Sequence, residues 1–234
     1  MLIESYYSED KNGINVSRQQ ASSFAKGVAD DFNPLHNPEA KLFCVPGDLL
    51  FALVLAKFGV NQQMRFTFSG MVDDSRSLHF AEQDAGRLGL LDSEGKSYLE
   101  VERGGANSRQ ENLVESLTRN YVAFSGHTFP HILIPLMAQH DVMINPARPI
   151  VIYQSMEIDL ERVDIPEAEL EFSRAHLDVE GKRGSVRLDF LLKFSGRTIG
   201  SGTKHMALRG LRRFDQQVVD EMISTYLNHK QLGC

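Results

Sequence analysis

The chain has 234 residues, of which 42% are hydrophobic and 24% are charged, and it contains 14 Phe. This composition is typical of a globular protein with a large buried core, and it excludes a disordered or fibrous chain. The net charge of −6 and the scattered Lys and Arg residues argue against a nucleic-acid-binding surface. The sequence favours neither a leader nor a membrane span, so we expect a cytoplasmic protein. Two cysteines, Cys44 and Cys234, suggest no disulfide framework, and no metal site is indicated.

The first predicted helix lies within residues 16–31. Ser17 is a suitable N-cap and Gln20 stands three residues later, which is the capping-box pattern. The prolines of two Asn-Pro steps, at residues 33–34 and 37–38, disfavour helical geometry in the residues before them. We therefore expect the helix to end near Asp31 and a loop to follow.

An apolar segment comes next, from about residue 48 to residue 58, with Gly59 as its stop. It is apolar on nearly all sides, which predicts a buried helix. Short runs rich in β-branched and aromatic residues follow and predict an antiparallel sheet. These runs are residues 64–70, 77–83, 96–105 and 111–124.

The same plan then repeats. A second apolar helix is predicted over residues 129–142, behind Pro130, which lies 84 positions after Pro46. Four more strands are predicted at residues 149–160, 168–181, 185–196 and 197–210, and an amphipathic helix at residues 216–230. This self-similarity predicts two units, residues 1–124 and 125–234. In each α+β unit a curved antiparallel sheet would wrap round one mostly apolar helix.

The stretch "DFNPLHNPEA", residues 31–40, carries the pattern D-x-N-P-x-H. It resembles the hydratase motif of the MaoC-like (R)-specific enoyl-CoA hydratases. The duplicated plan resembles a double hotdog fold, and "RTIGSGTKHMAL", residues 197–208, is similar to the closing strand of hotdog domains. Over its whole length the chain resembles a bacterial family of uncharacterised hotdog proteins, for which the resemblance implies no reaction.

The hydratase resemblance implies that Asp31 and His36 act together on a water that adds to a 2-enoyl thioester. Such a reaction needs one group to take a proton and another to supply one, and both residue types can do so when partly buried. Asn33 would hold the loop and lie at the substrate site. The substrate would be an acyl-CoA or an acyl carrier, with no cofactor beyond the coenzyme A or pantetheine of the substrate. The protein would be a monomer or a homodimer.

The amino end of the buried helix offers donors for the thioester oxygen, because its first amides lack intrahelical acceptors. Gly47 and Asp48 would supply these amides. The chain departs here from the hydratases, which usually have His-Gly and an apolar residue at the helix start, whereas this chain has Pro46-Gly47-Asp48. An ionised Asp48 would oppose the charge that develops on the thioester oxygen unless its side chain turned back to cap the helix.

Several other interpretations remain open at the level of the sequence. The protein could bind an acyl chain or acyl carrier without catalysis, or hydrolyse a thioester. Cys44 precedes a helix, where a thiolate is favoured, and His36 could activate it. Basic turns such as residues 180–184 could meet the phosphates of coenzyme A. The three histidines that flank the second predicted helix, at 127, 131 and 140, are expected to be structural.

Overall fold

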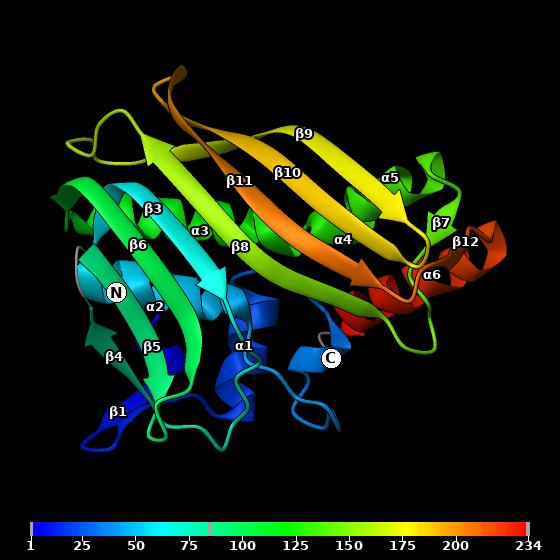
Figure 1. Cartoon of the computed structure of the whole chain (residues 1–234), viewed down its shortest axis with the longest axis horizontal. Helices are drawn as coiled ribbons and strands as arrows, with labels where there is room; N and C mark the ends of the chain where they lie inside the picture. The colour runs from blue at the N-terminus through cyan, green and yellow to red at the C-terminus, as the bar shows by residue number, and fades with distance from the viewer. Residues whose placement is uncertain (1, 84–85, 233–234) are drawn as a thin grey trace.

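The computed structural model describes residues 2–83 and 86–232, so Cys234 lies outside the described residues (Figure 1). In chain order the elements are η1 (Glu4–Tyr6), β1 (Ser8–Asp10), β2 (Gly13–Asn15), α1 (Arg18–Gly27), η2 (Pro34–His36), α2 (Gly47–Phe58), β3 (Val60–Phe68), β4 (Leu78–Glu82), β5 (Arg87–Asp92), β6 (Ser97–Ser108), α3 (Glu111–Gly126), α4 (Thr128–His131), α5 (Leu133–Gln139), β7 (Val142–Met143), β8 (Ile150–Leu160), β9 (Glu169–Glu180), β10 (Arg183–Phe194), β11 (Arg197–Arg209), β12 (Arg212–Arg213) and α6 (Gln216–Leu232).

One curved sheet contains ten of the strands in the order β1-β2-β4-β5-β6-β3-β8-β11-β10-β9, and every described pair is antiparallel. Strands from the first half of the chain occupy one side of this sheet, and strands from the second half occupy the other. The two sides meet where β3 pairs with β8, with Gln63 opposite Asp159 and Thr67 opposite Ser155. The sheet is therefore continuous across both halves.

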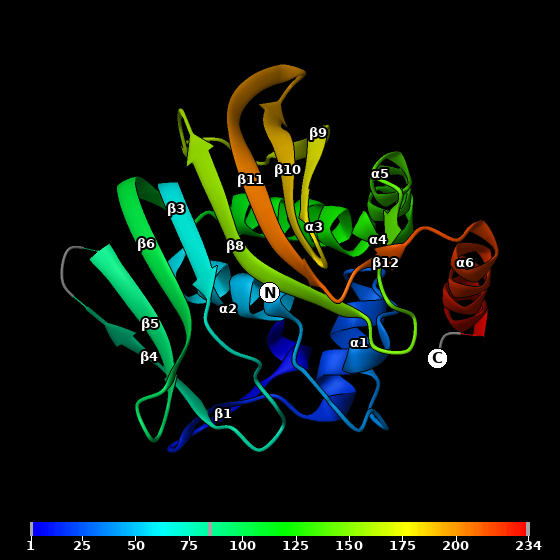
Figure 2. The ribbon, with the colours of Figure 1, turned by 45° about the vertical axis from the view of Figure 1, so that its right-hand side comes forward.

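Helices α2 and α3 pack against each other behind the sheet, as Figures 1 and 2 show. All residues of α2 from Asp48 to Leu55 are buried, because the sheet covers one side of the helix and α1 and α3 cover others. A sheet with one apolar face needs such a cover. The fold is therefore α+β, and two antiparallel half-sheets that pack on the apolar helix α2 and the amphipathic helix α3 form a double hotdog.

The prediction of a strand at residues 111–124 is wrong, because this segment forms most of α3. Its buried residues recur with the period of a helix: Leu113, Leu117 and Tyr121 lie four positions apart. The β-branched and aromatic residues suggested a strand, but packing against α2 and β9 overrides that local preference.

The single helix predicted over residues 129–142 is also wrong. The segment forms two short helices, α4 and α5, with a break between them at Ile132. Phe129, which precedes Pro130, has an extended backbone. Pro135 has no N–H to donate to the His131 carbonyl, and it lies in the first turn of α5, where that donor is not needed. The helix that accompanies α2 is α3. The division into residues 1–124 and 125–234 stays a prediction, and its boundary falls in the last turn of α3.

Other predicted elements are confirmed. Helix α1 begins behind Ser17, whose side chain accepts from the Gln20 amide while the Gln20 side chain accepts from the Ser17 amide. Helix α6 and strands β3, β4, β6 and β8 to β11 also occur where the patterns placed them. Strands β1, β2 and β5 were not predicted, and the first two contain only three residues each.

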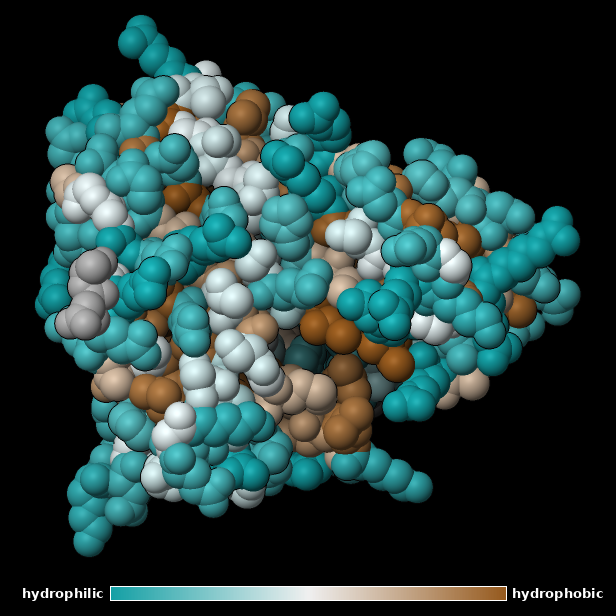
Figure 3. Space-filling model, viewed as in Figure 1, coloured by the Kyte–Doolittle hydropathy of each residue, from teal (hydrophilic) through white to brown (hydrophobic). Residues whose placement is uncertain are grey.

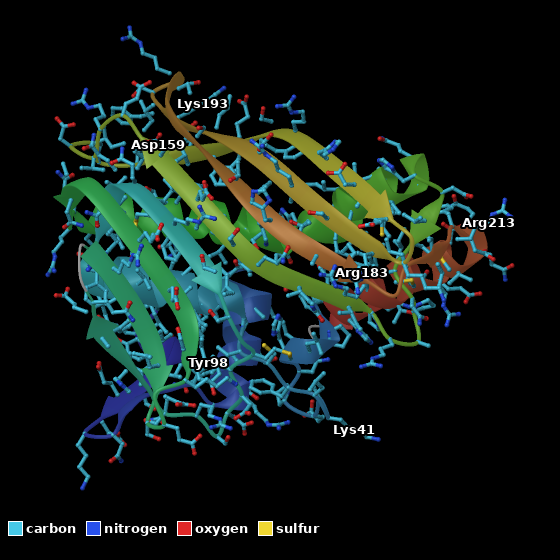
Figure 4. All side chains as sticks on the ribbon, in the orientation of Figure 1. Lys41, Tyr98, Asp159, Arg183, Lys193 and Arg213 are labelled. Atoms are coloured by element: carbon cyan, nitrogen blue, oxygen red, sulfur yellow. The ribbon has the colours of Figure 1, made fainter. Side chains whose placement is uncertain are left out.

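The outer face of the sheet is rich in charged side chains (Figure 4). Asp159 and Lys193 lie toward one end of this face, and Arg183 toward the other. This face has a shallow groove, which is lined by Arg65, Glu102 and Glu157 among others and lies on the opposite side of the sheet from α2. Within residues 2–83 and 86–232, no helix is long and apolar enough to cross a membrane.

Candidate active site

The D-x-N-P-x-H motif folds into two consecutive local turns. The Asp31 carboxylate accepts a hydrogen bond from the Asn33 amide through Oδ1, at 2.9 Å. The Asn33 side chain in turn accepts from the Leu35 amide, at 3.1 Å, and caps η2, which has Pro34 in its first turn. These Asx turns explain the Asp, Asn and Pro of the motif, because each fixes the backbone of the next step. They leave Asp31 Oδ2 directed toward His36.

His36, at the end of η2, is 9% exposed and has a defined ring orientation. Its Nδ1 lies 2.7 Å from the carbonyl oxygen of Cys44. A carbonyl oxygen can only accept, so Nδ1 carries the hydrogen and donates. In the neutral ring the lone pair is therefore on Nε2, which lies 3.6 Å from Asp31 Oδ2. The structure thus brings the two predicted catalytic side chains together, and the basic nitrogen of His36 points toward the Asp31 carboxylate.

The amino end of α2 adjoins this pair. Pro46 is the N-cap, and its carbonyl accepts from the Leu49 and Leu50 amides. The Gly47 and Asp48 amides precede the first intrahelical donor, and helix geometry gives them no intrahelical acceptor. Asp31 and His36 lie near enough to Asp48 to influence its pKa.

The Asp48 side chain does not cap α2. It turns into the protein, where Asp48 Oδ2 accepts from Ser125 Oγ of α3 at 2.5 Å. Ser125 Oγ also accepts a hydrogen bond from the ammonium group of Lys204 on β11. Asp48 and Lys204 are 8% and 4% exposed, respectively. The Asp48 side chain therefore does not turn back to cap the helix, and a lysine from the second half of the chain lies near it.

Burial sets the direction of both pKa shifts. Desolvation raises the pKa of Asp48, although Lys204 and Ser125 oppose this rise. Desolvation lowers the pKa of Lys204, although Asp48 and Asp31 oppose this fall. Burial therefore favours the neutral form of each group, and the presence of the other group offsets part of that effect.

Aromatic rings form a wall of this region. The Lys204 ammonium lies 4.2 Å from the centroid of the Tyr153 ring, and the Tyr153 hydroxyl contacts the Tyr121 hydroxyl. Tyr153 also packs against Phe68, with ring centroids 4.2 Å apart. A Cβ on Gly47 would lie 3.0 Å from Tyr153. A side chain at this position would press on the aromatic wall, so glycine suits the start of α2.

The surface is hollowed near the motif. In Figure 3 a depression lies where β8 passes the loop that carries η2, and hydrophobic residues gather round its rim above a hydrophilic floor. A polar floor with an apolar rim suits a ligand that has both a polar group and an apolar part.

Cys44 does not have the properties of a nucleophile. Desolvation raises its pKa to about 11, and its sulfur donates to the Val45 carbonyl at 3.2 Å. The thiolate is therefore a minor form at neutral pH. The His36 ring is turned to the carbonyl of this residue and not to its sulfur.

A second group of charged residues ties α6 to the motif loop. Asp30 has a positive φ of 53°, and its carboxylate contacts His127 Nε2 at 2.7 Å and the Lys230 ammonium. The Tyr226 hydroxyl donates to the Asp30 carbonyl. His127 thus has a structural partner beside the loop, and α6 fixes the residue that precedes Asp31.

Sequence reasoning missed Ser125, Lys204, Tyr121 and Tyr153. Lys204 had a recognisable signal: it stands in phase with Met206 and Leu208, so it occupies an inward position of an alternating strand. Ser125 lies four residues after Tyr121 on the buried face of α3. Because residues 111–124 were interpreted as a strand, this buried helix face was not recognised from the sequence.

The fold and this cluster together define a double hotdog protein with a histidine–aspartate pair beside the amino end of its first buried helix. Residues 1–217 match the family described as "Protein of unknown function (DUF3581)", and the chain belongs to this family. No curated protein matches the chain significantly.

Three solved structures illustrate what the fold is similar to. An acyl-CoA thioesterase II from Mycobacterium marinum is 10% identical, with a TM-score of 0.44 over 90% of this chain and 98% of the other. A MaoC-like dehydratase is 11% identical, with a TM-score of 0.42 over 88% and 98%. The peroxisomal multifunctional enzyme type 2 from Drosophila melanogaster is 12% identical, with a TM-score of 0.43 over 82% and 47%. Similarity at this level says nothing about the reaction of this chain.

Proposed function

We propose that this protein adds water to, or removes it from, an acyl thioester of coenzyme A or an acyl carrier, using Asp31 and His36. The observation that carries this proposal is the geometry of the pair: His36 donates through Nδ1 to a fixed carbonyl and turns Nε2 toward Asp31, 3.6 Å away. This distance exceeds a direct hydrogen bond, and a water held by both groups would be oriented by both.

In the hydration direction, His36 Nε2 takes a proton from the water as the water oxygen bonds to C3 of the enoyl group. The electron pair of the double bond moves toward the thioester carbonyl. The two residues, Asp31 and His36, together supply one proton to C2. One proton is taken and one is returned, so the enzyme ends in its starting state. A single well-placed acid or base of this kind accelerates a reaction by about 10² to 10⁴-fold.

Negative charge develops on the thioester oxygen during this step. The Gly47 and Asp48 amides at the amino end of α2 would receive that oxygen, as the dipole of the helix favours negative charge there. Asn33 serves in this proposal by holding the loop, since its side-chain oxygen is already engaged by Leu35.

The test is the rate at which purified variants consume a 2-enoyl-CoA, followed by the loss of absorbance of the conjugated double bond. We expect Asp31→Asn and His36→Gln to lower kcat by about 10²-fold or more. Asp220→Asn and His140→Gln, which change exposed residues of the same types, should leave kcat unchanged. Full activity in both motif variants would refute the assignment of the pair.

Two other outcomes identify the alternatives. Release of free thiol without loss of the double bond would indicate thioester hydrolysis. Saturable binding of acyl-CoA with neither reaction, over a range of chain lengths, would indicate a binding protein in which the motif serves only the loop.

A further inference from the structure

A buried acid–base cluster lies behind the motif, and its side chains take no part in the proposed reaction steps. It combines Asp48 from α2, Ser125 from α3 and Lys204 from β11, all less than 10% exposed. Buried ionisable side chains are costly unless each is compensated, so their presence at one point needs a reason.

The position of Asp48 supplies that reason. It follows the first residue of α2, so its carboxylate is tied to the same helix end that would receive the thioester oxygen. An unbalanced negative charge here would oppose the charge that forms on that oxygen. Ser125 holds Oδ2 toward α3, and within the described residues Asp48 Oδ1 is buried without a hydrogen-bond partner. The carboxylate is therefore restrained from one side and depends on Lys204 for its balancing charge.

We propose that the second half of the chain completes the site: Lys204 balances the charge of Asp48, and Ser125 turns its carboxylate away from the carbonyl-binding amides. Both are positioning residues, because they act through Asp48. This inference rests on the proposed function. It also gives a role to the half of the chain that lacks the D-x-N-P-x-H motif.

The groups that face Asp48 come from every neighbouring element. Asp31 and His36 face it from the motif loop, Ser125 from α3 and Lys204 from β11, with the tyrosine pair of α3 and β8 behind them. With Lys204 present, the Asp48–Lys204 pair carries no net charge, whether the proton lies on the carboxylate or on the amine. Without Lys204, the charge of the site depends on whether Asp48 is protonated.

The experiment compares Lys204→Met with the double variant Asp48→Asn/Lys204→Met, using kcat and KM for a 2-enoyl-CoA across pH. In Lys204→Met we expect kcat to fall by roughly 10-fold or more with little change in KM. The loss should deepen as pH rises, because the remaining carboxyl ionises and opposes the developing charge. The double variant keeps the backbone amide at position 48 but has no side-chain charge to balance, so relative to Lys204→Met it should regain most of the lost kcat and lose the added pH dependence.

A wild-type kcat and pH profile in Lys204→Met would overturn the proposal. So would a folded double variant as slow as the single one. If Lys204→Met does not fold, the kcat and pH profile of the double variant alone test the proposal. Its failure to fold would also count against the proposal, since a buried ion pair replaced by neutral side chains of similar size is usually tolerated. Failure of the proposed function appears separately, as full activity in Asp31→Asn and His36→Gln.

Discussion

Replacement of Gly126 by alanine tests how α3 supports the motif loop. Gly126 is the last residue of α3, and a Cβ there would lie 1.8 Å from the Ala29 carbonyl oxygen and 3.4 Å from Asp31 Cβ. The nearest atom is backbone and cannot swing aside as a side chain does. The segment between α1 and Asp31 must therefore move by roughly 1 Å or more to reach an ordinary contact distance.

The magnitude follows from two opposing terms. Overpacking that shifts backbone costs about 1 to 3 kcal/mol and occasionally more. Alanine in a helix regains about 0.5 to 1 kcal/mol relative to glycine. The expected net loss is about 1 to 2 kcal/mol in the free energy of unfolding. A displacement of about 1 Å at a catalytic group can lower the rate by about 10²-fold, so kcat should fall by more than the loss of stability suggests.

Urea denaturation and kcat for a 2-enoyl-CoA measure the two effects. Gly27→Ala is the matched control, because Gly27 ends α1 and a Cβ there would meet no heavy atom closer than 4.0 Å. The control should be as stable as the wild type or slightly more stable, with the same kcat. If Gly126→Ala had wild-type stability and wild-type kcat, the close packing of α3 on the motif loop would be refuted.

Three more predictions follow from the burial and charges of single residues. In a Cys234→Ser background, Cys44 should be alkylated by iodoacetamide at pH 8 about 10²-fold more slowly than a free thiol, because burial raises its pKa to about 11; rapid alkylation of the folded protein would contradict this. Burial raises the pKa of Asp30, but hydrogen bonds from Lys230 and His127 lower it by more, so it lies below 3.8. Its contribution to stability is therefore present above pH 3.8 and is lost as pH falls through the folded-state pKa. The protection factors of the α6 amides in hydrogen exchange, which correct for the intrinsic pH dependence of exchange, should therefore fall over that range, and less so in Asp30→Asn. Phe51→Ala should cost about 3 to 5 kcal/mol of unfolding free energy, since Phe51 is fully buried between Phe66 and Tyr121, whereas Leu227→Ala, at an exposed position, should cost at most about 0.5 kcal/mol; equal losses in the two variants would count against the assigned core.

The motif loop and the first buried helix could be predicted from sequence because local rules govern both. The capping box at Ser17, the Asn-Pro steps after Asp31 and the apolar run that follows are short-range signals, and the structure has α1, η2 and α2 in those places. The amphipathic pattern of α6 was equally local. Signals of this kind depend little on what the rest of the chain does.

Helix α3 and the buried cluster could not be predicted from sequence, because both depend on tertiary packing. In α3, Val114, Tyr121 and Val122 favour a strand by type, but their spacing matches a helix face covered by α2 and the sheet. The partners of Asp48 come from positions 77 and 156 residues further along the chain, so no local pattern near Asp48 could indicate them. The alternating pattern of β11 could have shown that Lys204 points inward, but nothing in the sequence indicated that it lies near Asp48.

The most direct test of the central claim is a crystal structure of the Asp31→Asn variant with a bound 3-hydroxyacyl-CoA. The account predicts that the hydroxyl at C3 lies within hydrogen-bond distance of His36 Nε2 and of the side chain at position 31. It also predicts that the thioester oxygen accepts a hydrogen bond from the Gly47 amide. A thioester bound away from the amino end of α2, or a C3 hydroxyl without contact to His36, would contradict the account.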